Sequence, residues 1–197
     1  MVKKASMAVA ALIVVAILAV AGCGEKEVKR IRQEEEGVGE TLTFDGHLDN
    51  PEWGGAQRTQ DVYEIDFAQE ANVTEGREVQ LTRLTVNLRW VDDHSGTDSQ
   101  DVTDPFMVNI TVGNVTVSSG FRDTGQITLT LPNNQVTDKM LAENTTVQIT
   151  VYIGDCGTYA APPFIFGRLV RYYDTGNDYT MTVDYSYLEV WYETKNA

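Results

Sequence analysis

Short segments in which apolar and polar residues alternate fill the chain from Thr41 onward, and they constrain the fold more than any other feature. Between residues 84 and 90, every second side chain is apolar and the side chains between them are polar. Successive side chains of a strand point to opposite faces, so this pattern is typical of a strand with one buried face. Such segments predict strands at residues 41–44, 62–67, 79–91, 106–112, 114–117, 126–131, 145–153 and 179–192.

The connections between these segments indicate the fold class. Gly113 and Asn114 predict a two-residue hairpin turn, because both residue types tolerate the positive φ that such turns need. About eight strands without a long apolar helix predict an all-β fold, an antiparallel β-sandwich that is either immunoglobulin-like or a jelly roll. A short helix fits residues 139–143, and a bulge or a covered strand end is expected beyond Tyr187, where both strand faces become apolar.

One connection is apolar instead of polar. Residues 160–167 have the sequence AAPPFIFG, whereas loops that run over a protein surface are normally polar. We interpret this segment as a loop that either caps an open end of the sandwich or contacts a partner or a membrane.

The N-terminal 24 residues predict export and a membrane tether. Lys3 and Lys4 precede an uncharged apolar run, and a positive flank stays on the cytoplasmic side, so the rest of the chain is expected to face outward. The residues VAGC that end at Cys23 resemble a prokaryotic lipobox, which implies cleavage and lipidation of Cys23. The run is also about as long as a spanning helix, so a retained membrane anchor is the alternative. Both predict a membrane-anchored protein on the extracytoplasmic side.

Residues 25–40 separate this segment from the strands. They carry charges almost throughout and show no apolar periodicity, so they predict a solvated linker, either helical or disordered. The expected organisation is therefore a signal or anchor at residues 1–24, a charged linker at residues 25–40 and one extracytoplasmic β-sandwich domain at residues 41–197.

Charge and residue counts exclude several classes of function. With 29 acidic and 15 basic residues, the chain would be repelled by nucleic acid. The two cysteines, Cys23 and Cys156, form no disulfide framework, and we interpret Cys156 as a buried or inert thiol. Only two histidines are present, and no hydrolase, P-loop or zinc-protease motif occurs, so a non-catalytic protein without a cofactor is expected.

An acidic stretch between two predicted strands is the candidate calcium site. Calcium takes six to eight oxygen ligands, and flexible carboxylates in a loop can supply them. The spacing does not match a D-x-[DN]-x-[DN]-G calcium loop, so a solvated acidic turn is the alternative. The candidate ligands are Asp92, Asp93, Asp98, Asp101 and Asp104.

Aromatic residues supply a candidate sugar site. Trp53 follows a turn-rich acidic segment and could stack on a sugar ring, with packing at the edge of the sandwich as the alternative. Trp90 is in register with the apolar residues of its strand, so we expect it in the core. The role of Trp191 is left open.

Four N-x-[ST] sequons make surface glycosylation plausible on an exported protein. Asn109 and Asn114 lie on either side of the predicted turn, and strand alternation places Asn109 on the outward face. The four candidates are Asn72, Asn109, Asn114 and Asn144.

Two resemblances follow from these segments. Residues 88–93, 104–106, 125–130 and 176–180 resemble uncharacterised secreted β-sandwich domains that are common in archaeal surface lipoproteins. Residues 44–53, FDGHLDNPEW, are similar to the opening of family-nine carbohydrate-binding modules, which often have D-G-x-L-D-E-x-E-W. The first resemblance implies a surface location and a sandwich fold, and the second implies sugar binding.

The resulting hypothesis is a membrane-tethered, non-catalytic module that contributes to surface structure or binds an envelope protein. A carbohydrate-binding lipoprotein that holds a glycan is the first alternative, and an envelope enzyme whose acidic cluster binds a metal is the second.

Overall fold

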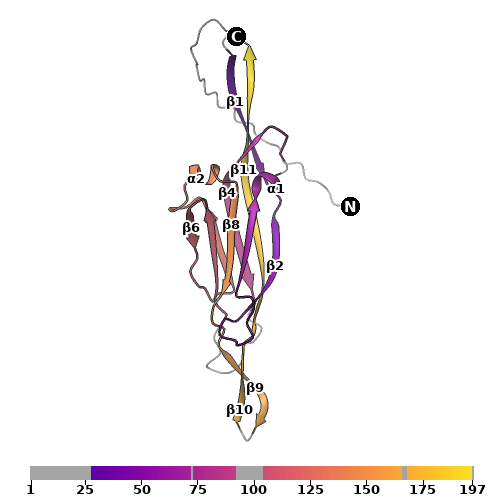
Figure 1. Cartoon of the computed structure of the whole chain (residues 1–197), viewed down its shortest axis with the longest axis vertical. Coiled ribbons are helices and arrows are strands. Elements are labelled where there is room, and N and C mark those ends of the chain that lie inside the picture. Colours follow the sequence, from indigo (N-terminus) through magenta and orange to yellow (C-terminus); the bar gives the residue numbers. More distant parts are fainter. Residues whose placement is uncertain (1–27, 72, 92–103, 166–167, 197) are drawn as a thin grey trace, which may run out of the picture.

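The computed structural model describes residues 28–71, 73–91, 104–165 and 168–196 (Figure 1). Within these residues the chain forms eleven strands and two short helices. In chain order they are β1 (Val28–Val38), β2 (Leu42–Asp49), β3 (Gln60–Asp66), α1 (Phe67–Glu70), β4 (Glu78–Trp90), β5 (Phe106–Val112), β6 (Val115–Ser118), β7 (Gln126–Leu131), α2 (Asp138–Ala142), β8 (Thr146–Ile153), β9 (Thr158–Ile165), β10 (Arg168–Tyr173) and β11 (Gly176–Asn196).

Two antiparallel sheets pack against each other, which confirms the predicted all-β sandwich. In the five-stranded sheet, β11 pairs on one side with β2 and β1 in succession and on the other side with β4, which in turn pairs with β7. The four-stranded sheet has the order β3-β8-β5-β6. Strands β2 to β8 and β11 correspond to the eight predicted strands, and α2 corresponds to the predicted short helix.

Alternating side chains from the two sheets form the core. Leu84, Val86 and Leu88 of β4 and Phe106 of β5 are all fully buried. Burying an aliphatic or aromatic side chain of this size stabilises a fold by about 1.5–3 kcal/mol. Trp90 is also buried, with its ring centroid 4.9 Å from that of Phe106, which confirms its expected core position.

Tyrosines of β11 lie over glycines of β1, of β2 and of the connection between them. Gly46 of β2 is directly opposite Tyr179, and a Cβ added to Gly46 would lie only 2.5 Å from Cζ of Tyr179. The ring therefore occupies the space that any larger residue at position 46 would need. Because each tyrosine fits over one glycine, these contacts help to set the strand register. The three pairs are Gly46–Tyr179, Gly39–Tyr185 and Gly37–Tyr187.

A bulge interrupts the pairing of β4 with β11 between Ser186 and Tyr187, just before the segment where the sequence predicted a bulge or a covered strand end. Ser186 is opposite Arg83, but Tyr187 is opposite Leu81, so Thr82 is an extra residue on β4. The predicted hairpin turn is also confirmed, since Val112 pairs with Val115 and Gly113 has a φ of 57°.

The prediction of a helical or disordered segment at residues 25–40 is wrong for the part that the structure describes. Residues 28–38 form β1, which pairs with β11 from Val28 opposite Asn196 to Val38 opposite Ser186. The backbone of β11 extends past β2 and offers unpaired groups at the sheet edge, and this distant partner overrides the charged local sequence. Pairing of β11 with β4 ends at Val190, so beyond that residue β1 and β11 continue as a two-stranded ribbon (Figure 1).

The described part of the apolar segment, residues 160–165, belongs to a β-hairpin instead of a loop. Strands β9 and β10 pair with each other and project from the end of the sandwich opposite the ribbon (Figure 1). Their register shifts so that Phe164 and Ala161 face the adjacent residues Leu169 and Val170. The two prolines at 162 and 163 lack N–H groups for the ladder, which explains the irregularity at this point.

Candidate functional site

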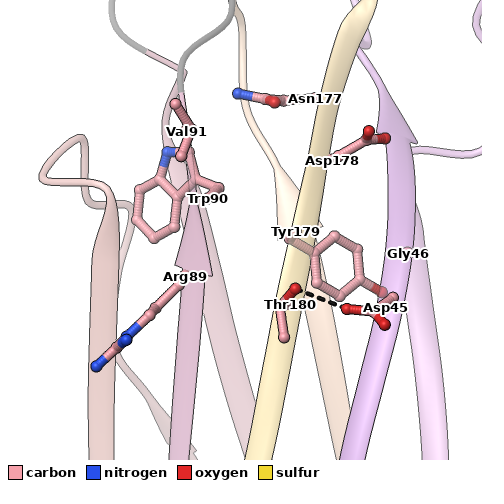
Figure 2. A pocket seen from close by; sticks show the side chains of 9 residues that line it. All are labelled: Asp45, Gly46, Arg89, Trp90, Val91, Asn177, Asp178, Tyr179 and Thr180. Atoms are coloured by element: carbon pink, nitrogen blue, oxygen red, sulfur yellow. Dashed lines mark hydrogen bonds between the residues drawn. The ribbon is translucent and has the colours of Figure 1, made fainter.

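A groove lies on the five-stranded sheet where β4 ends and β11 begins, and Figure 2 shows the side chains that line it. It has a volume of about 980 Å³ and is lined by residues of β2, β11 and β4 and by Val91, which follows β4. The strand register brings Asp45, Thr180 and Arg89 into one row, since Thr180 is opposite both of the others. The full lining set is Asp45, Gly46, Arg89, Trp90, Val91, Asn177, Asp178, Tyr179 and Thr180.

One polar group of this row is held by a hydrogen bond, and another is exposed to solvent. Thr180 Oγ1 donates a hydrogen bond of 2.6 Å to Asp45 Oδ1, which holds the carboxylate over β11 (Figure 2). Arg89 is exposed and has no hydrogen bond or ion pair to another residue that the structure describes. Val91 is 79% exposed beside them. The row thus offers a fixed acceptor, a cation without a partner among the described residues and one exposed apolar side chain.

A second polar row lies beside the groove. His47 Nδ1 lies 2.7 Å from Asp178 Oδ1, and its Nε2 lies 3.7 Å from Asp49 Oδ1. The Asp49 carboxylate accepts hydrogen bonds from the backbone N–H groups of Gln57 and Arg58, each at 2.7 Å. These two bonds lower the pKa of Asp49, so it stays ionised and ties the turn after β2 to the strand.

A buried polar cluster joins the two sheets behind the groove. Asp61 of β3 accepts hydrogen bonds from Arg58 and from the Tyr179 hydroxyl, and the Tyr63 and Tyr179 hydroxyls lie 2.6 Å apart. Burial and the hydrogen bond to Asp61 raise the pKa of Tyr179, which keeps it a neutral donor. The groups satisfy one another, so we interpret the cluster as a link between the sheets. The predicted strand at 62–67 began one residue too late to include Asp61 as an inward-facing acid.

Most of the predicted calcium ligands lie outside the described residues, as does the predicted lipidation site. This applies to Asp92, Asp93, Asp98 and Asp101, and to Cys23. Asp104 is described and buried: its Oδ2 accepts a 2.6 Å hydrogen bond from Asn177, and its carbonyl accepts one from Trp90 Nε1. No group of three or more His, Cys, Asp or Glu side chains suited to a metal occurs in the part of the chain that the structure describes. Calcium binding stays a prediction.

Trp53 is half-buried in the turn that follows β2. Its ring covers Gly55, whose added Cβ would lie 2.6 Å from Trp53 Cζ2, and the backbone N–H of Trp53 donates to the Asn50 carbonyl. Part of the ring therefore packs on its own turn, and sugar stacking there stays a prediction. Trp191, whose role the sequence did not indicate, is also half-buried. Its ring centroid lies 3.9 Å from Cζ of Arg77.

The sequons differ in their surroundings. Asn72 lies outside the described residues. Asn114 is exposed at the β5–β6 turn, whereas Asn109 and Asn144 are half-buried. Cys156 is buried, and burial, followed by the negative charge of Asp104, raises the pKa of its thiol, in agreement with the expected unreactive cysteine.

Comparison with known proteins adds little to this geometry. No family model matches the sequence, and no curated protein matches it. A solved structure of infectious bursal disease virus, Gt strain, matches with 10% identity and a TM-score of 0.28, over 89% of this chain and 41% of that chain. A TM-score this low supports no argument about the fold or the function. Among the described residues, no helix is both long enough and apolar enough to cross a membrane.

Proposed function

We propose that this chain is a membrane-tethered, non-catalytic module on the extracytoplasmic side that presents one end of a β-sandwich to a partner in the envelope. The observation that carries the proposal is the opposite placement of two projections. The ribbon holds Val28 opposite Asn196 at one end, and the β9–β10 hairpin leaves from the other end (Figure 1). A tether that precedes residue 28 therefore enters at the ribbon, and the hairpin and the groove point away from the membrane.

The strand order supports the jelly-roll form of the sandwich over the immunoglobulin form. The eight strands of the body form sheets with the orders β2-β11-β4-β7 and β3-β8-β5-β6. Apart from the β5–β6 hairpin, each connection between successive body strands crosses from one sheet to the other. Two four-stranded sheets built in this way are typical of the double Greek key of jelly rolls.

The location is tested by digesting intact cells with a protease. The β domain should be degraded while cytoplasmic markers survive, and complete protection of the domain would overturn the proposed topology. Substituting Cys23→Ser separates the two tethers, because it abolishes lipid labelling only if Cys23 is the lipidated residue.

The orientation is tested by photo-crosslinking in native membranes. A crosslinking residue placed at position 164 of β9 should attach to an envelope component, and the same residue placed at the exposed position Lys139 of α2 should not. Equal attachment from both positions would contradict a partner-binding hairpin end.

Glycan binding in the groove is a second candidate function. Neighbouring strands lie about 4.8 Å apart, so Asp45 and Arg89 on either side of Thr180 can bond to separate hydroxyl groups of one sugar chain. Binding on a glycan array should fall at least tenfold in Arg89→Gln and persist in the control Arg83→Gln. Loss in Trp53→Ala alone would instead place the sugar at the turn after β2.

A further inference from the structure

Three of the four sequons lie in the described residues, and they differ in whether the amide nitrogen can carry a sugar. Asn144 lies just after α2, is half-buried and donates a 2.7 Å hydrogen bond from Nδ2 to the Met140 carbonyl. A glycan on Nδ2 would have to replace this bond and displace the end of the helix. Asn144 is therefore used by the fold as a helix-terminal donor.

Asn109 is constrained by its position within a sheet. It lies in the middle of β5, opposite Thr150 of β8 on one side and Ser118 of β6 on the other. Its side chain is on the outward face, as the alternation predicted, but Oδ1 is buried and the residue is only partly accessible. A glycan at this site would have to lift a partly buried carboxamide off the surface of the sheet.

Asn114 has none of these constraints. It is exposed at the second position of the two-residue turn, next to Gly113, and the structure gives its side chain no hydrogen bond to another described residue. The sequon hydroxyl of Thr116 is exposed as well, and it lies 2.9 Å from the hydroxyl of Thr111 across the hairpin. Both groups that define the sequon are thus exposed on the β5–β6 hairpin.

The turn also lies at the end of the sandwich that suits a bulky group. Val112 pairs with Val147, near the start of β8 and beside α2, whereas the other end of β8 leads through Gly154 to the hairpin. Asn114 is therefore at the ribbon end, away from both the hairpin and the groove. A glycan there would cover the end that faces the membrane and leave the proposed binding end uncovered.

We propose that Asn114 carries an N-linked glycan and that Asn109 and Asn144 remain unmodified in the folded protein. In the transfer, Nδ2 of Asn114 forms a bond to the anomeric carbon of an oligosaccharide and loses a proton. The bond between that carbon and the phosphate oxygen of a polyprenyl-phosphate-linked sugar donor breaks, and the lipid phosphate leaves. This inference rests on the proposed extracytoplasmic location, because such donors are used on that side of the membrane.

The test is intact-mass and glycopeptide analysis of the full chain purified from the membranes of its native host. A glycan mass should be attached to the peptide that contains Asn114, and it should disappear in Asn114→Gln and in Thr116→Ala. The conservative variant Thr116→Ser keeps the sequon and should keep the mass. The matched control Asn144→Gln should lose none of it.

Combined with the protease test, the result shows whether the glycan alone or also the proposed location is wrong. An unmodified Asn114 in a protein that protease reaches from outside overturns the glycan and leaves the location intact. An unmodified Asn114 in a fully protected protein overturns both. A glycan found on Asn109 or Asn144 would contradict the argument from accessibility.

Discussion

The two halves of β11 show how differently one continuous strand can be supported. Between Tyr179 and Val190 it pairs with β4 on one side and with β2 and then β1 on the other, and Met181 and Val183 are fully buried in the sandwich. Beyond Val190 it pairs with β1 alone, and Tyr192 is 55% exposed. Both halves have backbone hydrogen bonds, but only the first buries a continuous apolar face. An isolated two-stranded ribbon is marginally stable, so hydrogen bonding without burial should leave the second half more prone to local opening.

Specific side chains compensate for the missing burial at the base of the ribbon. Glu35 and Glu189 are directly opposite each other, where two like charges would repel. Arg77, in the turn before β4, donates to Glu189 at 2.6 Å and to Glu35 at 3.3 Å, and it stacks on Trp191. The hydrogen bond to Glu189 is the main reason that the pKa of Arg77 is raised. Arg77 therefore bridges the two like charges at the base of the ribbon, and Arg32 of β1 adds a 3.1 Å hydrogen bond to Gln80 of β4.

The largest effect is expected from core truncation in the first half of β11. Met181→Ala should lower the free energy of unfolding by about 2–5 kcal/mol, because it leaves a cavity between the two sheets. The matched ribbon variant Tyr192→Ala should change it by less than about 0.5 kcal/mol. Urea unfolding followed by circular dichroism measures both values. Equal losses would show that the ribbon is as much a part of the cooperative unit as the sandwich.

Glycine replacement under a tyrosine ring should have the next largest effect. Gly46→Ala places a Cβ 2.5 Å from Cζ of Tyr179, and forcing the ring aside should cost about 1–3 kcal/mol in thermal or urea unfolding. Gly54→Ala is the control, since its added Cβ meets no atom within 4 Å. A neutral Gly46→Ala would mean that the ring moves freely and does not set the register of β2.

Alkaline pH should weaken the first half of β11. Burial raises the pKa of Tyr179, Tyr185 and Tyr187 above the ordinary value near 10. Above that pH the unfolded chain releases phenolic protons that the native state retains. The stabilisation from the neutral phenols is therefore complete below about pH 10 and declines as pH rises toward the native pKa values. The decline should reach about 1.4 kcal/mol per pH unit for each tyrosine.

Urea unfolding between pH 9 and pH 12 tests this sign. The free energy of unfolding should fall less steeply with pH in Tyr185→Phe than in the unaltered protein, when each is compared with its own value at pH 8. A slope that does not change in Tyr185→Phe would contradict a buried, protonated phenol at this position.

The smallest global effect is expected from Arg77→Ala. Removing the guanidinium leaves Glu35 and Glu189 facing each other and uncovers Trp191, so amide hydrogen exchange of residues 191–196 should become several-fold faster. The melting temperature of the sandwich should hardly change, because the core is untouched. Arg83→Ala, an exposed residue of β4, should leave exchange in the ribbon unaltered. A large drop in melting temperature for Arg77→Ala would refute local anchoring.

The sequence predicted the strands of the sandwich but not the residues that line the groove. The sequence singled out Trp53 and the acidic residues 92–104, because tryptophan and clustered aspartate have recognisable chemistry on their own. The groove residues Asp45, Arg89 and Thr180 have ordinary neighbours and lie far apart along the chain. They become a row only when β2, β11 and β4 pair in one register, and a shift of one residue would turn them to the opposite face.

The sequence by itself determined the elements whose signals are local. The period of two in β4 and β5, the Gly113–Asn114 turn and the inward position of Trp90 all depend on neighbours a few residues away, so they could be predicted without a fold. Tertiary structure decided the state of residues 28–38. They have no apolar period of their own, and they become a strand because β11 offers an unpaired edge that is distant in sequence. Residues of almost any type can form backbone hydrogen bonds between strands. The pairing partner therefore determined that residues 28–38 form a strand, and their composition could not predict it.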